Sequence, residues 1–294
     1  MQIKPNEILF VINPNSGKQN PDSIIRQIKN TGYQIDHVLT QSLDEFNKLF
    51  VEKINRYKVV VICGGDGSVN CALKHLALKR ELILAVLPNG SGNGFARELG
   101  FTSHVGHLIS RILKGETRKV DLVKINDDYS INVAGLGFDS YVASLFDGSK
   151  FRGLKKYIYC TIKGLFSYKP ISVELMMGQV KVTGDVWGVY LANTRQFGNN
   201  AIIAPEAKFD DGLLEVVLMK KYPLLLAPVV VYKMFTGKFK NSKYLTYLRA
   251  SELVVKSNSE TYHVDGEPKQ MTEDLKVSIE KQCLNVIKMN DDVS

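Results

Sequence analysis

The feature that most constrains the fold is an apolar run that breaks into glycines, VVVICGGDGSVN at residues 59–70. A run of β-branched and apolar residues is typical of a strand buried on both faces. After the glycines, Val69, Leu73 and Leu76 recur with helical spacing. Glycines let a backbone approach an anion, and a helix N-terminus directs N–H groups and partial positive charge at it. The stretch therefore predicts a strand, a turn and a helix that together bind phosphate.

Two other loops follow apolar strands in the same way. NPNSGK, residues 13–18, ends the strand expected at 7–13, and LPNGSGNGFA covers residues 87–96. Ligands of open α/β sheets bind beyond the carboxyl ends of the strands. Neither loop has the spacing of a Walker A motif. Because a plain turn does not need so many glycines, the three loops favour one shared phosphate site.

Strands and helices alternate over the first part of the chain. This order predicts a mostly parallel sheet with helices on both faces. We expect strands at 7–13 and 33–40, a strand that begins at residue 59, and a strand at 82–88. We expect helices at 21–31, 43–56, 95–99 and 104–114, and one more helix directly after the glycines at 64–67.

Beyond residue 115 strands dominate, which predicts a second, antiparallel domain that we expect to be a β-sandwich. Helices are expected there at 154–167 and 224–236. We place an α/β domain at 1–125 and a β-rich domain at 126–294, whose last residues could pack back on the first domain. The strands expected in the second part are 117–125, 129–134, 171–177, 179–193, 213–219, 244–248, 251–256, 260–264, 275–280 and 284–289.

The charge balance narrows the class of partner. The chain of 294 residues carries a formal net charge of +8, which favours an anionic partner such as a nucleotide, a nucleic acid or a membrane surface. No nucleic-acid-binding signature is present, so nucleic acid is not expected. The absence of a long apolar run, a signal peptide and a CxxC pair predicts a cytoplasmic protein.

The glycine motifs also carry a family resemblance. Gly64-Gly65-Asp66-Gly67-Ser68 resembles the GGDG[TS] signature of the diacylglycerol, sphingosine and NAD kinase superfamily, and residues 87–96 resemble the second glycine loop of its lipid-kinase branch. NPNSGK resembles the NPxSGK motif of the same family. The resemblance covers nearly the whole chain and implies a Rossmann-like first domain, a β second domain and an active site in the cleft between them. It implies nucleotide contacts from Asn13, Pro14, Ser16, Gly17, Thr40, Gly64, Gly65, Asp66, Gly67, Ser68, Asn70, Ser91 and Asn93.

Three carboxylates are the candidates for catalysis. Asp66 would lie close to phosphates, which is favourable if Mg²⁺ or a proton intervenes. The alternative is a cap on the following helix, with the carboxylate on the N–H of Val69. HVDGEP, residues 263–268, is by composition a hairpin turn. The resemblance implies instead that this turn carries the general base toward a lipid hydroxyl. We predict Glu267 as the base with Asp265 beside it, although the sequence does not separate the two.

A third segment, PEAKFDDGLL at residues 205–214, resembles the segment that binds a structural Mg²⁺ in bacterial lipid kinases. The resemblance implies that Asp211 and the carbonyls of Lys208 and Leu213 hold the ion, and that Asp121 reaches it through water. A simple Asp-Asp-Gly turn is the alternative. NVAGLGFD, residues 132–139, is similar to the family's N..G.G.D segment, which implies only a place at the substrate cleft.

Together these patterns predict an Mg²⁺-dependent lipid kinase that moves the γ-phosphate of ATP to a lipid hydroxyl. Diacylglycerol is the first candidate acceptor. Many relatives have aspartate at the position of Gly94, and its absence makes the loop resemble the SGNG or SGNA loop of sphingosine-type kinases. A long-chain base is therefore the second candidate acceptor. An NAD kinase-like enzyme and a catalytically silent nucleotide or lipid sensor are the alternatives. Apolar stretches flanked by lysines at 155–159 and 223–235 are either core helices or a transient contact with the inner face of the membrane. The resemblance also allows a homodimer.

Overall fold

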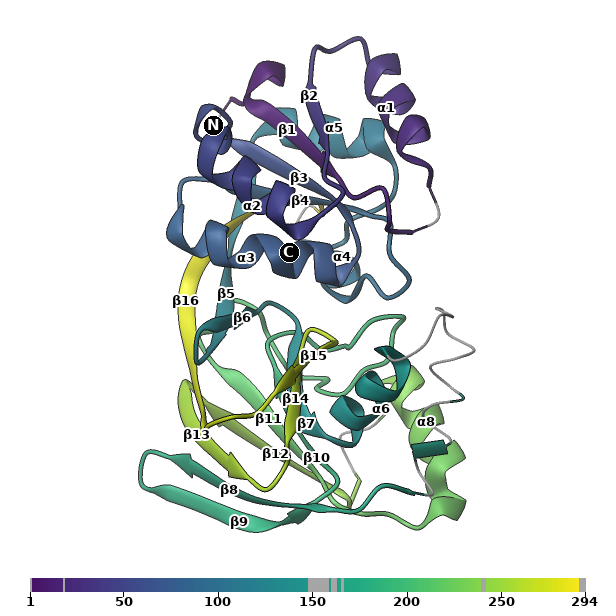
Figure 1. The fold of residues 1–294 in the computed structure, drawn as a ribbon, viewed down its shortest axis with the longest axis vertical. Helices are drawn as coiled ribbons and strands as arrows, with labels where there is room; N and C mark the ends of the chain where they lie inside the picture. The colour runs from purple at the N-terminus through teal and green to yellow at the C-terminus, as the bar shows by residue number, and fades with distance from the viewer. Residues whose placement is uncertain are drawn as a thin grey trace. The chain divides into compact units, whose positions relative to one another are not determined.

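The computed structural model describes residues 2–17, 19–147, 159, 163, 164, 167–238 and 242–290. The chain divides into two compact units (Figure 1). The first comprises Met1–Val120 together with Gln282–Ser294, and the second comprises Asp121–Lys281. The last part of the chain thus belongs with the first unit. Among the described helices, none is both long and apolar enough to cross a membrane.

The first unit is built on a parallel sheet. Its strands are β1 (Ile8–Ile12), β2 (Asp36–Leu39), β3 (Val59–Gly64) and β4 (Ile83–Pro88), in the order β2-β1-β3-β4. The end of β16 (Leu275–Ile287) adds a further parallel strand beside β4. Every residue of β1 and β3 is buried, as their apolar runs predict. The predicted α/β domain is confirmed.

Helices connect these strands, and polar side chains fix where two of them begin. Asn20 caps α1 (Pro21–Asn30), and Ser42 caps α2 (Leu43–Glu52). The helix expected to continue to residue 56 ends at Glu52 and is followed by the 3₁₀ turn η2 (Ile54–Arg56), which buries Ile54. The other helical elements are η1 (Pro5–Glu7), α3 (Asp66–Leu78), α4 (Gly94–Glu98) and α5 (Val105–Lys114).

The second unit contains two antiparallel layers. One has the order β12-β11-β10-β7-β14-β15, and the other places β13 between β8 and the first half of β16, with β9 beside β8. Apolar side chains of both layers form one core, including Leu136, Leu191, Leu175 and Val255. The predicted sandwich is confirmed. The strands are β5 (Thr117–Ile125), β6 (Asp128–Ser130), β7 (Val133–Gly137), β8 (Ile171–Met177), β9 (Val180–Val186), β10 (Gly188–Ala192), β11 (Leu214–Met219), β12 (Leu245–Ala250), β13 (Glu252–Ser257), β14 (Thr261–Val264) and β15 (Glu267–Gln270).

Two expected strands are each divided in the structure. The strand expected at 179–193 changes layer at Trp187, because β9 pairs with β8 whereas β10 pairs with β7 and β11. The strand expected at 129–134 is interrupted at Ile131 and Asn132, whose N–H groups bond to the Asp265 side chain. Conversely, the strands expected at 275–280 and 284–289 form one strand, β16.

The helices of the second unit also differ from expectation. The segment from Phe138 to Asp147 forms α6, which the glycine-rich sequence before it did not predict. The helix expected at 224–236 is η3 (Leu224–Leu226) followed by α8 (Ala227–Thr236). The helix expected at 154–167 falls largely outside the described residues.

Candidate active site

The carboxyl ends of β1, β3 and β4 bring the three glycine loops together. The parallel register pairs Ile12 with Cys63 and Gly64 with Pro88. The ladder continues into the loops, where the Asn13 N–H donates to the Cys63 carbonyl at 3.2 Å and the Asn89 N–H donates to the Gly64 carbonyl at 2.9 Å. The three loops predicted from sequence therefore lie side by side.

The first and third loops are joined by the Asn89 side chain, which is buried. Its amide nitrogen donates to the carbonyls of Ser16 and Gln19 at 2.9 and 3.1 Å, and its oxygen accepts from the Gln19 N–H at 2.9 Å. Gly17 has φ +85°, and a Cβ there would lie 1.3 Å from the Asn89 carbonyl oxygen. Gly17 is thus required both for its conformation and for the close approach.

The first and second loops are joined through a hydroxyl. The Asn13 amide donates to Ser68 Oγ at 3.1 Å, and Ser16 Oγ donates to the Asn13 carbonyl at 3.0 Å. A Cβ on Gly64 would lie 2.4 Å from Ser68 Oγ. Ser68 therefore orients Asn13, and its predicted contact with nucleotide stays a prediction.

The second and third loops touch backbone to backbone. A Cβ on Gly90 would lie 2.5 Å from the Cα of Gly65. Asn93, with φ 52°, closes the third loop by accepting from the Gly90 N–H at 2.9 Å and donating to the Gly90 carbonyl at 2.8 Å. The glycines at these positions allow two backbones to pack without side chains between them.

Asp66 joins the same two loops, and the N-cap position of its own helix, which was its alternative role, is occupied by Gly65. The N-cap of α3 is Gly65, whose carbonyl accepts the Val69 N–H at 3.1 Å. The Asp66 carboxylate instead accepts from the Gly94 and Phe95 N–H groups at 3.0 and 3.3 Å. It therefore binds the first residues of α4, where a carboxylate complements the helix dipole.

The other residues predicted to contact nucleotide lie on or beside these loops. Thr40 is buried, and its N–H donates to the Ile12 carbonyl at 3.0 Å. Gly67 and Asn70 lie in the first turns of α3, Pro14 is half-buried in the first loop, and Ser91 is exposed in the third. The result is a compact cluster of loop N–H and hydroxyl groups in the first unit.

In the second unit, the predicted catalytic turn joins β14 to β15. Asp265 and Gly266 have φ 50° and 90°, and Val264 pairs with Glu267 across the hairpin. Two residues with positive φ are what a tight type I′ turn requires, and Asp-Gly suits it. The sequence expectation of a hairpin turn agrees with this geometry.

The two carboxylates of this turn differ in their surroundings. Asp265 accepts hydrogen bonds from Ser130 Oγ at 2.6 Å, Ile131 N–H at 3.1 Å and Asn132 N–H at 2.9 Å. The Glu267 side chain is exposed and forms no hydrogen bond or ion pair with the described residues. Asp265 therefore holds the turn in place, while Glu267 is exposed to solvent.

The predicted metal-binding turn is joined directly to Asp121, which is buried. Asp121 Oδ2 accepts from the Gly212 N–H at 2.7 Å, and the Asp121 N–H donates to the Phe209 carbonyl at 2.7 Å. Asp211 is exposed, and its Oδ1 accepts from the Leu213 N–H at 3.0 Å. The structure thus brings Asp121 to the turn that contains Lys208, Asp211 and Leu213.

The donors at this turn fit a hard cation. Carboxylate and carbonyl oxygens are the ligands that Mg²⁺ prefers, with water completing the shell. Two carboxylates alone are too few, and the described residues contain no group of three or more His, Cys, Asp or Glu suited to a metal. The carbonyls of Lys208 and Leu213 would have to contribute. The Lys281 chain lies over the turn as well, since a Cβ on Gly212 would be 2.6 Å from Lys281 Cε.

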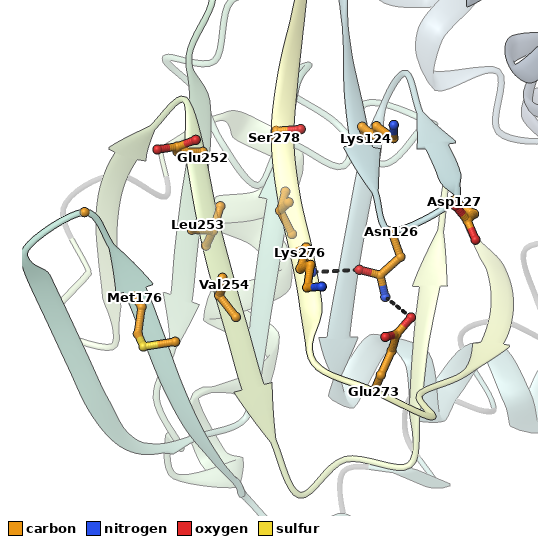
Figure 2. A pocket seen from close by; sticks show the side chains of 12 residues that line it. Lys124, Asn126, Asp127, Met176, Glu252, Leu253, Val254, Glu273, Lys276 and Ser278 are labelled. Carbon is orange, nitrogen blue, oxygen red and sulfur yellow. Dashed lines mark hydrogen bonds between the residues drawn. The ribbon is translucent and has the colours of Figure 1, made fainter.

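A surface groove elsewhere in the second unit contains none of these predicted residues (Figure 2). It lies over β5, β8, β13 and β16 and mixes both signs of charge. Within it, Asn126 accepts from the Lys276 N–H at 2.8 Å and donates to Glu273 at 3.3 Å. Because the groove contains none of the predicted site residues, it is not the candidate active site.

Sequence reasoning missed several residues that hold the site together. Asn89, Ser130 and Asn132 act through hydrogen bonds to loops distant in the sequence. His263, which is buried, and Asp139, which is partly buried, were also missed and form a pair behind the predicted catalytic turn. The only sequence signal for His263 and Asp139 was that they lie in two segments that resemble family motifs, residues 263–268 and 132–139.

The chain matches two family models that together cover most of its length. Residues 7–125 match the diacylglycerol kinase catalytic domain, and residues 132–288 match the YegS C-terminal NAD kinase beta sandwich-like domain. The chain belongs to the diacylglycerol kinase and YegS-like family of lipid kinases. The protein is therefore an enzyme of the lipid kinase class, and membership of a kinase family implies ATP.

Individual relatives agree with this assignment. A diacylglycerol kinase of Bacillus subtilis is 25% identical over 270 residues, 88% of each chain. A protein of Shewanella frigidimarina named as a probable lipid kinase, YegS-like, is 28% identical over 227 residues, 74% of each chain. The crystal structure of a diacylglycerol kinase from Bacillus anthracis superposes with a TM-score of 0.73 at 18% identity, covering 98% of both chains, and so shows the shared fold.

Proposed function

We propose that this lipid kinase transfers the γ-phosphate of ATP to a lipid hydroxyl, with diacylglycerol as its acceptor. The observation that carries the proposal is the interlocked set of three glycine loops at the carboxyl ends of β1, β3 and β4. Such loops offer backbone N–H groups to phosphates and leave no side chain in the way. The Bacillus subtilis relative, which aligns over 88% of both chains, supports diacylglycerol.

In this proposal the loops position the nucleotide. Asn13, held by Ser68, and the N–H groups at the start of α3 would contact the phosphates. Asp66, whose carboxylate accepts hydrogen bonds from the first residues of α4, would keep the distance between the second and third loops constant. Mg²⁺, when bound, would neutralise phosphate charge during transfer. Asp121 and Asp211, with the carbonyls of Lys208 and Leu213, are the proposed ligands of a structural cation.

Glu267 is the proposed general base. It is exposed and follows directly on a turn that Asp265 fixes through three donors. A base must come within hydrogen-bond reach of the hydroxyl proton that it accepts, so a rigid turn helps to place it. Asp265 would then act by holding the turn rather than by accepting the proton. This separates two carboxylates that the sequence left equivalent.

The first test measures phosphate transfer from γ-labelled ATP in mixed micelles that contain diacylglycerol, sphingosine or no lipid, and in solution with NAD⁺. We expect labelled phosphatidic acid from the natural protein and at least about 100-fold less from Glu267→Gln, the usual size of a general-base contribution. Glu260→Gln, an exposed carboxylate just before β14, is the matched control and should keep full activity.

Each other outcome identifies a different function. Labelled NADP⁺ would replace the proposal with NAD kinase activity, and labelled sphingosine phosphate would move the acceptor to long-chain bases. ATP binding without any labelled product would indicate a sensor. Full activity of Glu267→Gln would remove Glu267 from the role of base.

A lipid acceptor requires contact with a membrane, and α8 is the proposed contact surface. Large apolar side chains on and just before this helix are exposed: Leu225, Val229, Val231, Tyr232 and Phe235. The three-residue spacing of Val229, Tyr232 and Phe235 places these three on one side of α8. Exposed lysines flank them, including Lys220, Lys221 and Lys238. Apolar side chains bordered by lysines suit an anionic bilayer. The stretch expected at 155–159 lies outside the described residues except for Tyr159, which is exposed.

Vesicle sedimentation tests this surface. We expect binding to vesicles that contain phosphatidylglycerol to exceed binding to pure phosphatidylcholine and to weaken with salt. The double variant Tyr232→Ser, Phe235→Ser should lower partitioning about tenfold or more, because two large side chains no longer enter the bilayer. Val180→Ser on β9, which is 56% exposed, is the control. An equal loss in the control would contradict a role for α8.

A further inference from the structure

Directly behind the catalytic turn lies a buried histidine that the proposed mechanism does not use. We propose that His263, held by Asp139, is a positioning residue that fixes Gly266 and through it Glu267. The inference rests on the proposed role of Glu267 as base. His263 is 3% exposed and lies on β14, in the hairpin whose turn is Asp265-Gly266.

The two ring nitrogens of His263 face different partners. Nδ1 accepts a hydrogen bond from the Gly266 N–H at 3.1 Å, and Nε2 contacts Asp139 Oδ2. A nitrogen that accepts from a backbone N–H carries no proton, so the neutral ring keeps its proton on Nε2 and donates it to Asp139. Asp139 thus selects the tautomer whose Nδ1 can hold the turn.

Asp139 lies in the first turn of α6, where the helix dipole stabilises a carboxylate. Its Oδ1 is buried and has no hydrogen-bond partner among the described residues. The strand β7 lies directly against the pair. A Cβ on Gly135 would be 2.9 Å from Asp139 Oδ2 and 3.1 Å from His263 Nε2. Only glycine at this position leaves room for the contact between Asp139 and His263.

Two ties, meaning hydrogen bonds between a side chain and the backbone, hold this turn, in which Asp265 has φ 50°. One tie is the Asp265 carboxylate, which bonds to the chain at 130–132. The other is His263, which binds the second turn residue, Gly266. Glu267 follows Gly266 directly, so its placement depends on both ties.

The same geometry makes the tie sensitive to protonation. A proton added to Nδ1 would face the Gly266 N–H and break that hydrogen bond. Burial disfavours the charged ring, but the carboxylates of Asp139 on α6 and Asp265 on the hairpin outweigh it and raise the pKa of His263. The ring of Phe197, which also faces His263, is uncharged. Catalytic turnover should therefore fall as the pH drops through this raised pKa.

Two variants separate the two sides of the ring. His263→Asn places an amide oxygen near the position of Nδ1 and keeps an acceptor for Gly266. His263→Gln reaches toward Nε2, keeps a donor for Asp139 and loses that acceptor. We expect His263→Asn to keep kcat within about threefold. His263→Gln should lower kcat about 10- to 100-fold, the usual cost of removing an orienting partner, with KM for ATP unchanged.

Asp139→Asn provides a further readout. The amide oxygen can still accept from Nε2, but the negative charge is gone. We expect kcat at alkaline pH to be retained and the acid limb of the kcat profile to move to lower pH, because Asp139 no longer raises the pKa of His263. A purely structural role would leave the position of this limb unchanged.

Amide hydrogen exchange of Gly266, followed by NMR, tests the hydrogen bond between Gly266 and His263 without an assay of enzyme activity. His263→Gln should speed exchange at Gly266 at least about tenfold, whereas His263→Asn should not. If the natural protein phosphorylates no lipid, the proposed function fails while this measurement still decides the tie. Unchanged exchange at Gly266 in His263→Gln would overturn the inference. An equal loss of kcat in His263→Asn and His263→Gln, together with an unchanged acid limb of the kcat profile in Asp139→Asn, would overturn it as well.

Discussion

The glycine loops of the first unit and the carboxylate turns of the second are held in place in different ways. In the first unit, side-chain bonds such as those of Asn89 and Asp66 are accompanied by backbone contacts so close that side chains are excluded, as between Gly65 and Gly90. In the second, a side chain reaches across the sequence to a distant backbone, as Asp265 does to residues 130–132. The first arrangement leaves its requirement visible in the sequence as glycines. The second leaves an ordinary aspartate in an ordinary turn.

Adding one methyl group to the glycine loops should give the largest effect. Gly90→Ala would place its Cβ 2.5 Å from the Gly65 Cα, and backbone must shift to relieve the contact. A displacement of about 1 Å in a positioned site commonly costs about 100-fold, so we expect ATP affinity, measured by calorimetry, to fall by that order. Gly106→Ala on α5, where the added Cβ meets nothing within 4 Å, is the control and should bind ATP normally. Equal affinity for the two variants would mean that close backbone contact is not what shapes the loops.

Removing the carboxylate of Asp265 should give an effect of similar size, on stability. Asp265→Ala leaves three buried donors without their acceptor, so we expect the free energy of unfolding to fall by about 3 kcal/mol. Glu267→Ala changes an exposed side chain and should stay within about 0.5 kcal/mol. Urea unfolding of both variants measures the difference. Similar losses would show that the two carboxylates do not divide the structural and chemical roles.

The smallest expected effect concerns the cation at the turn that contains Asp211. Saturating Mg²⁺ should raise the free energy of unfolding by about 1–3 kcal/mol, and chelation should reverse the gain. Asp211→Asn should abolish this dependence, because it weakens an oxygen ligand, whereas Asp127→Asn, on an exposed turn, should preserve it. Stability that does not respond to Mg²⁺ in the natural protein would point to Lys281 as the cation that serves this turn.

Much of the fold could be predicted because it depends on local pattern. The apolar runs at β1 and β3 and the glycines after them specify buried parallel strands with loops at one end. The change of layer at Trp187 could not be predicted, because continuous alternation looks the same whether a strand pairs with one sheet or passes to another. The helix α6 was missed because the glycines before it suggested only a turn.

The site shows the same limit at the scale of single residues. Which residues gather was largely predictable, but which partner each one takes was not. Asp66 binds α4 rather than its own helix, and Asp265 rather than Glu267 carries the structural bonds. Both choices depend on residues 28 or more positions away in the sequence. Composition and spacing carry no information on such contacts.

The end of β16 has a consequence for the order in which the protein can fold during synthesis. Asn285 and Val286 pair with Ile83 and Leu84 of β4. The Lys288 N–H donates to the Glu116 carbonyl, and Arg111 Nε donates to the Lys288 carbonyl. A ribosome that has made only the first 120 residues has therefore produced the parallel sheet of the first unit with its β4 edge open. That edge stays unpaired until the chain beyond residue 282 emerges, and an unpaired edge is prone to aggregation. A fragment cut after residue 125 would keep the glycine loops but carry this exposed edge permanently.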